Sequence, residues 1–145
     1  MTDLVKTITD VFPTKRVVVV GDLVADQFLH GSISRVSREA PVFILRHEET
    51  ETRPGGAANA AANIATLGGN AAPVGCIGDD EAGRRLRDAL IDRQIGCEWI
   101  LEDLGSMTTT KVRVLAGQNY SVKQQVIRID YENPASLSAG SRAEL

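Results

Sequence analysis

GGAANAAANIATLGGNAAPVGCIG, residues 55–78, combines a helical composition with a short apolar run. Its alanine-rich first part predicts a helix that opens near Pro54 and Gly55, and the pair Gly68 and Gly69 suits a helix C-cap. Residues 71–78 form an apolar run bounded by glycine, which is typical of a buried strand. The segment therefore predicts a helix that leads directly into a strand of a sheet.

The same alternation continues on both sides of this segment. Upstream, RVVVV at 16–20 is a continuous β-branched run, which predicts a first central strand buried on both faces of a parallel sheet. Downstream, Asp79 or Asp80 can cap a helix that runs to about Gln94, and CEWIL after Gly96 begins a third buried strand. The order predicts the α/β class, with a mostly parallel central sheet flanked by helices.

Two other stretches predict a smaller side sheet. Within residues 27–48, the strings FLHGSI and VFILR are separated by polar residues and read as two strands. Within residues 107–130, two β-rich arms surround a turn with Gly117 and Asn119, which predicts a hairpin that could complete the same sheet. At the two ends, residues 3–12 predict a short capping helix stopped by Pro13, and residues 133–145 resemble the start of a capped helix. The 145 residues amount to about one domain.

Composition argues against several classes of function. A net charge of -3 and an aromatic content of 4% argue against a surface that binds nucleic acid. No apolar run approaches the ~18 residues of a membrane span, and the N-terminus lacks the pattern of a secretory signal. Cys76 and Cys97 lack CxxC spacing and predict two buried thiols in a reducing compartment, hence a cytoplasmic protein. His30 and His47 have no metal ligands at suitable spacing, so no metal site is expected.

The first candidate site is the loop GDLVAD after the strand at 16–20. Parallel α/β sheets bind ligands beyond the carboxyl ends of their strands. The chain lacks GxGxxG and GxxxxGK[ST], and Asp22 and Asp26 would repel a pyrophosphate. Ionised carboxylates suit sugar hydroxyls instead, because each accepts charge-assisted hydrogen bonds. We predict a sugar contact for Asp26, with a turn or cap as its alternative, and a turn-forming role for Asp22.

The second candidate site is the glycine pair that precedes the helix. Gly55 and Gly56 allow the main chain to approach a ligand, and the helix N-terminus offers unpaired amide donors. Asn59 and Asn63 lie one helical turn apart. Their structural alternative is to be hydrogen-bonded in a tight helix–sheet contact. We predict ligand contact for Asn59 and packing for Asn63.

Basic residues near both sites could meet an anionic substrate. Arg53 directly precedes Pro54 and the glycines, while Lys111 and Arg113 alternate on one face of a predicted strand. Such alternating charges also occur on ordinary solvated strand faces. We favour substrate binding for Arg53 and Lys111, and the solvated face for Arg113.

The glycine pair, the small residue after it, Asn59 and the later glycines match, at every fixed position, the first signature of PfkB-type carbohydrate kinases. The segment resembles that family far more specifically than a lone glycine motif would. Five further segments resemble the heptose-7-phosphate kinase branch of this family, over residues 16 to about 132: GDLVADQF, SRVSREAPVF, RPGGAAN, TTTKVRV and QQVIRID. One departure is Arg38, where that branch usually has proline in Ser-Pro-Glu-Ala-Pro.

The resemblance implies a ribokinase-like fold and a kinase that transfers the γ-phosphate of ATP, with Mg²⁺, to a heptose 7-phosphate hydroxyl in ADP-heptose synthesis for lipopolysaccharide. It implies that Asp26, Gly55, Gly56 and Asn59 bind sugar hydroxyls. The strands near 27–46 and 108–130 would form a lid over the sugar, through which relatives often dimerise.

In that family the catalytic Asp, the anion hole, the magnesium region and the ATP pocket lie in a later part that is not recognised in these 145 residues. We therefore expect the chain to be the sugar-binding half, with no catalytic residue, and to be inactive alone. Two alternatives remain. One is a non-catalytic sugar-binding or dimerisation module, and the other is a PfkB-type kinase for fructose phosphate, ribose or a nucleoside.

Overall fold

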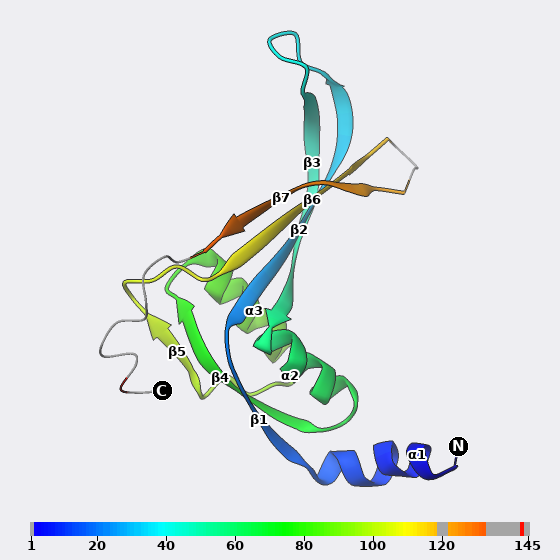
Figure 1. The fold of residues 1–145 in the computed structure, drawn as a ribbon, viewed down its shortest axis with the longest axis vertical. Helices are drawn as coiled ribbons and strands as arrows, with labels where there is room; N and C mark the ends of the chain where they lie inside the picture. Colours follow the sequence, from blue (N-terminus) through cyan, green and yellow to red (C-terminus); the bar gives the residue numbers. More distant parts are fainter. Residues whose placement is uncertain (1, 119–121, 133–142, 144–145) are drawn as a thin grey trace.

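Two β-sheets make up the chain in a computed structural model that describes residues 2–118, 122–132 and 143 (Figure 1). The body sheet has the strand order β1-β4-β5, from Arg16–Val20, Asn70–Gly78 and Ile100–Asp103. The lid sheet has the order β3-β2-β6-β7, from Phe43–Gly56, Leu23–Val36, Thr110–Gly117 and Gln124–Tyr131. Both segments that the sequence assigned to a side sheet therefore lie in one sheet.

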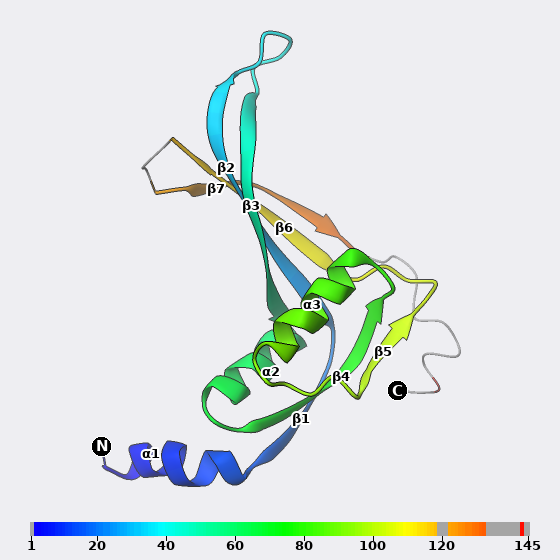
Figure 2. The ribbon, with the colours of Figure 1, turned by 180° about the vertical axis from the view of Figure 1, so that it is seen from behind.

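The body sheet is parallel, and two helices cover the same face of it (Figures 1 and 2). These helices are α2 (Ala57–Thr66) and α3 (Glu81–Ile91). The core between helices and strands contains Leu86 and Leu90, both 0% exposed. Burial of each such side chain contributes about 1.5–3 kcal/mol. The predicted α/β class is confirmed.

The opposite face of the body sheet is open among the described residues. Val18 pairs with Ala72 and Val20 with Val74, and the period of two puts Cys76 on the same face. Val18 is 64% exposed and Val20 73% exposed. The prediction that the strand at 16–20 is central and buried on both faces is therefore wrong. Both helices lie on the other face, and β1 pairs only with β4 among the described residues. We call these five residues the open face.

Helix α2 begins later and ends as the sequence predicts. Residues 54–56 still belong to strand β3, so the helix starts at Ala57 rather than near Pro54. Gly68 has a φ of 87°, and the N–H groups of Gly68 and Gly69 donate to the carbonyls of Ala65 and Ile64, each at 2.9 Å. This pair of hydrogen bonds is a Schellman motif, which confirms the predicted C-cap.

The lid sheet has longer strands than the sequence predicts. β2 and β3 have 14 residues each and pair antiparallel, β2 pairs parallel with β6, and β6 pairs antiparallel with β7. Of the polar stretch between the two strings, Arg35 and Val36 are still paired in β2, and residues 37–42 connect β2 to β3. The predicted turn at Asn119 and, except for residue 143, the predicted C-terminal helix at 133–145 lie outside the described residues.

The remaining elements follow the sequence with shifted ends. The N-terminal helical segment comprises α1 (Thr2–Lys6), a π-helical turn (Thr7–Val11) and a 3-10 turn (Phe12–Thr14). Its side chains Leu4 and Val5 are 66% and 59% exposed, so it does not cap the core in the described residues. α3 ends at Ile91 rather than near Gln94, and β5 begins at Ile100 rather than Cys97. Short apolar runs define element type better than element ends.

Asp80 and Thr108 connect the body to the lid. The Asp80 carboxylate accepts hydrogen bonds from the N–H of Gly83 at 2.8 Å and from the N–H and hydroxyl of Thr108 at 2.8 and 2.7 Å. Thr108, only 2% exposed, also accepts from the N–H of Gly78 at 2.9 Å. Asp80 is thus the N-cap of α3, as predicted, and also holds the segment that enters β6. We call this network the Asp80 clamp.

Both cysteines are reduced, and both are half-buried rather than fully buried. Burial raises the pKa of the Cys97 thiol, and Glu98 adds to that effect against the opposing influence of Arg87. Within the described ranges, none of the helices combines the length and apolar character of a membrane span.

Candidate functional site

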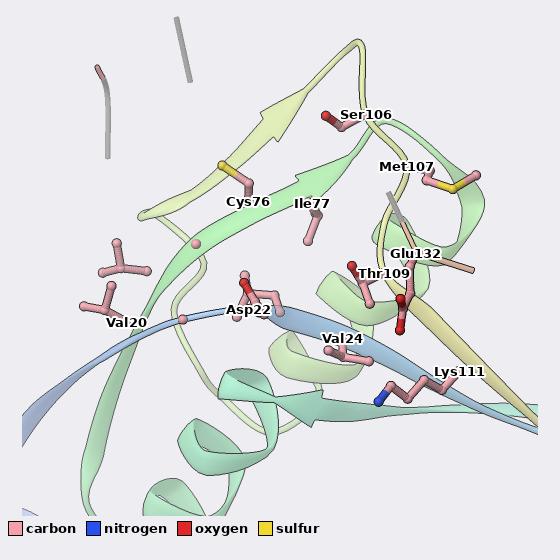
Figure 3. A pocket seen from close by; sticks show the side chains of 14 residues that line it. Val20, Asp22, Val24, Cys76, Ile77, Ser106, Met107, Thr109, Lys111 and Glu132 are labelled. Carbon is pink, nitrogen blue, oxygen red and sulfur yellow. The ribbon is translucent and has the colours of Figure 1, made fainter. Parts of the chain in front are cut away.

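A cavity of about 620 Å³ lies where β1 and β4 end and the lid begins (Figure 3). Its walls come from Val20–Val24, Val74–Ile77, the segment before β6, and Glu132. The polar side chains on its lining belong to Asp22, Cys76, Ser106, Thr109, Lys111 and Glu132. The cavity lies beyond the carboxyl ends of parallel strands, where α/β sheets bind their ligands.

Asp26 lies in β2 next to this cavity and forms a half-buried ion pair. It is opposite Arg53 of β3 and Lys111 of β6, so the three side chains share one face of the lid sheet. Its Oδ1 accepts a hydrogen bond from Nη2 of Arg113 at 3.1 Å, and the two side chains are 23% and 26% exposed. A carboxylate paired in this way stays oriented while retaining free acceptor capacity.

The position of Arg113 corrects the sequence prediction. A solvated strand face was expected, but Arg113 is opposite Phe28 and reaches along the face to Asp26. Its guanidinium lies 5.8 Å from the centre of the Phe28 ring. The reason is the parallel pairing of β2 with β6, which places Arg113 two residues along the strand from the position opposite Asp26, on the same face.

The glycine pair has a structural explanation as well as a binding one. A Cβ on Gly55 would lie 2.9 Å from Oδ2 of Asp26 and 3.1 Å from the carbonyl of Val24. Gly56 has a φ of 56°, and a Cβ there would overlap the carbonyl oxygen of Asp22. That carbonyl accepts from the N–H of Ala57 at 2.9 Å. Asp22 thus holds the start of α2 through its main chain, in agreement with a turn-forming role.

The two asparagines of α2 lie on its exposed side. Ala58, Ala61 and Ala62 form the buried face of the helix, and Asn59 and Asn63 are both exposed. The prediction that Asn63 is packed is therefore wrong, because the alanine stripe alone faces the sheets. Asn59 is in the first turn of α2 and does not line the cavity described above.

Arg53 and Lys111 have different surroundings. Arg53 donates two hydrogen bonds to the Glu51 carboxylate, at 2.7 and 2.8 Å, and lies 4.8 Å from the centre of the Phe28 ring. The Arg53 bonds hold the pKa of Glu51 below its usual value, against the smaller effect of burial. Lys111 lines the cavity (Figure 3). Of the predicted residues, the structure therefore groups Asp26, Arg53, Gly55 and Lys111, with Gly56 adjoining.

Sequence reasoning missed Phe28 and Glu51 and gave Arg113 another role. Lys111 and Arg113 alternate in a predicted strand and were expected to share a face, whereas Asp26 was expected in a loop. The structure instead places Asp26 in β2, on the same face of that strand as Phe28. Only the register between strands shows that the two faces are the same one. The described residues contain no cluster of three or more His, Cys, Asp or Glu side chains that could hold a metal ion.

The architecture matches ribokinase-like sugar kinases. A carbohydrate kinase from Agrobacterium tumefaciens aligns with a TM-score of 0.60 at 22% identity, over 81% of this chain and 35% of its own. The ribokinase of Arabidopsis thaliana, solved with ribose and ATP, aligns with a TM-score of 0.57 at 21% identity, over 90% and 41%. At these identities the likeness shows the fold alone.

Sequence comparison identifies the family. Residues 14–128 match the model of the pfkB family of carbohydrate kinases, and the chain belongs to this family. Bifunctional protein HldE of Alcanivorax borkumensis is 46% identical over 121 residues, which are 83% of this chain and 24% of that protein. HldE of Hyphomonas neptunium is 40% identical over 132 residues, 90% and 26%. The chain thus spans about a quarter of the length of these curated relatives.

Proposed function

We propose that this chain is the sugar-binding part of a kinase that phosphorylates a heptose 7-phosphate in ADP-heptose synthesis. The observation that carries the proposal is the Asp26 carboxylate, packed against the α-carbon of Gly55 where the lid meets the body. Such a carboxylate binds vicinal hydroxyls through charge-assisted hydrogen bonds. The adjoining cavity of about 620 Å³ is large enough for a sugar phosphate.

The proposed roles follow from the surroundings of each residue. Asp26 accepts hydrogen bonds from sugar hydroxyls, while the backbone of Gly55 and Gly56 lets the sugar approach the first turn of α2, where Asn59 lies. Lys111 lines the cavity and is suited to the phosphate of the substrate. Arg53 is largely exposed on the same face of the lid, where its charge would also attract that phosphate.

The choice of a heptose as substrate rests on the sequence segments that resemble the heptose-7-phosphate kinase branch and on the similarity to the HldE proteins. ATP and Mg²⁺ would supply the phosphoryl group and its charge neutralisation. No residue described here is assigned to either, and this chain's own contribution is to bind and orient the sugar. We therefore propose that the 145 residues alone do not transfer phosphate.

Calorimetry of the 145-residue chain with D-glycero-D-manno-heptose 7-phosphate tests the binding role, with fructose 6-phosphate, ribose and adenosine as competing ligands. We expect the heptose phosphate to bind most tightly, and Asp26→Ala to abolish most of its affinity. A preference for another ligand would change the substrate. Unchanged affinity in Asp26→Ala would reject the site.

An assay of ADP release separates kinase from binding module. The heptose phosphate, ATP and Mg²⁺ are supplied to the 145-residue chain and to a version extended with the later part of an HldE relative. We expect turnover only in the extended protein. No turnover there, with sugar binding intact, would favour a non-catalytic module.

We also propose a cytoplasmic homodimer formed through the lid. β7 is exposed along its whole length, and Val36, Phe43, Ile127 and Tyr131 are 55%, 62%, 54% and 47% exposed. Apolar side chains gathered on one sheet indicate an interaction surface. Sedimentation velocity should give a dimer for the wild-type chain and a monomer for Phe43→Asp with Ile127→Asp. A wild-type monomer would reject the dimer.

A further inference from the structure

The two oxygens of the Asp26 carboxylate have different surroundings. Oδ1 accepts the hydrogen bond from Nη2 of Arg113 at 3.1 Å. Oδ2 lies so close to the α-carbon of Gly55 that an added Cβ would be 2.9 Å from it. Rotation of the carboxylate would break the hydrogen bond to Arg113, and a side chain at position 55 would displace the carboxylate. Its orientation therefore depends on Arg113 and Gly55 together.

Arg113 also lies near the ring of Phe28, to which a second arginine is close. Its guanidinium lies 5.8 Å from the centre of the Phe28 ring, and that of Arg53 lies 4.8 Å from the same centre. Arg53 is held by two hydrogen bonds to Glu51. Guanidinium groups near an aromatic ring gain cation–π attraction and lose freedom. The lid sheet thus places Arg113 beside the Asp26 carboxylate through contacts that are present without a ligand.

We propose that Arg113 is a positioning residue for Asp26. It occupies one carboxylate oxygen from the lid and leaves the lone pairs of the other available to a sugar hydroxyl beside Gly55. This inference rests on the proposed sugar-binding function and adds a residue that has no direct contact with the sugar. Preorganisation of this kind lowers the entropy cost of binding.

A double-mutant cycle on the 145-residue chain tests the proposal. The variants are Asp26→Ala, Arg113→Gln and the two combined, and calorimetry measures affinity for heptose 7-phosphate and for the unphosphorylated heptose. We expect Arg113→Gln to weaken both ligands about tenfold, the range of coupled neighbouring residues. In the Asp26→Ala background, Arg113→Gln should cause no further loss of affinity, because the carboxylate that Arg113 orients is absent.

Two more variants distinguish positioning from general structure. Arg128 is opposite Arg113 in β7 and pairs with Asp130 rather than Asp26, so Arg128→Gln is a matched control. We expect that control to bind normally and Arg113→Lys to recover part of the lost affinity, because lysine keeps the charge without the planar fork. In ¹H–¹⁵N spectra the Gly55 amide should shift in Arg113→Gln and stay in place in Arg128→Gln.

Each contrary outcome has a distinct meaning. Normal binding by Arg113→Gln, with Asp26→Ala impaired, would overturn the positioning role and leave the sugar site intact. A loss that persists in the Asp26→Ala background, or that affects only the phosphorylated sugar, would overturn it in favour of direct phosphate contact. No effect of Asp26→Ala, or no binding by the wild-type chain, would overturn the proposed function and this inference with it.

Discussion

At the scale of single residues, the junction between Asp26 and Gly55 leaves no room for a side chain at position 55. An added methyl group would meet both the Asp26 carboxylate and the carbonyl of Val24, at 2.9 and 3.1 Å. The carboxylate can move away, but the backbone carbonyl is held in the pairing of β2 with β3. The glycine therefore determines where Asp26 can point.

Gly55→Ala should weaken heptose 7-phosphate binding at least about tenfold while costing only about 1–3 kcal/mol of stability, the usual range for overpacking. Calorimetry and thermal unfolding measure the two effects. Gly105→Ala is the control, because the nearest atom to its Cβ is 4.0 Å away. Equal affinity in both variants would show that the carboxylate does not need this space.

At the scale of elements, the Asp80 clamp joins α3 to the segment before β6. Asp80→Ala removes an N-cap and leaves the Thr108 N–H without its partner, so we expect a loss of about 2 kcal/mol. Asp79→Ala is the matched control, since its exposed pair with Arg84 should contribute at most ~1 kcal/mol. Urea unfolding measures both. Similar losses in the two variants would show that the Asp80 clamp stabilises the fold no more than an exposed ion pair does.

The clamp also predicts a dependence of stability on pH. Burial alone would raise the pKa of Asp80, but the hydrogen bonds from Thr108 and Gly83 outweigh it and hold the pKa below the usual value. A lowered folded pKa gives stability that is present above the unfolded pKa, about 3.9, and is lost as pH falls through the folded one. The stability difference between wild type and Asp80→Ala should stay constant above about pH 5 and shrink below about pH 4. A difference that persists at pH 2 would contradict this.

The sequence predicts element types better than their ends and partners. The Schellman glycines and the cap of α3, predicted at Asp79 or Asp80 and found at Asp80, depend on local chemistry and were predicted correctly. The burial of β1 and the pairing of Arg113 with Asp26 depend on neighbours distant in sequence, which no local pattern specifies. The sequence thus predicted that Asp26 lies near Gly55 and Gly56. It did not predict that Phe28 and Arg113 lie beside Asp26.

At the scale of the whole molecule, the open face leaves apolar surface in contact with water. Val18→Thr with Val20→Thr should reduce self-association of the chain, with little change in thermal unfolding, because both side chains are already exposed. Val122→Thr is the control, since Val122 is 90% exposed and is not one of the five open-face residues. Light scattering as a function of concentration measures the effect. Identical scattering by all three proteins would show that the open face does not associate.

β1 pairs with β4 along one side, so among the described residues its other side keeps unpaired backbone donors and acceptors. An unpaired strand of this kind is a template for a further extended segment. A peptide that added itself there would gain main-chain hydrogen bonds and, at the same time, shelter from water beside Val18 and Val20. The sheet can therefore grow at the β1 edge, and the chain that extends it there would also complete the wall of the cavity at Val20.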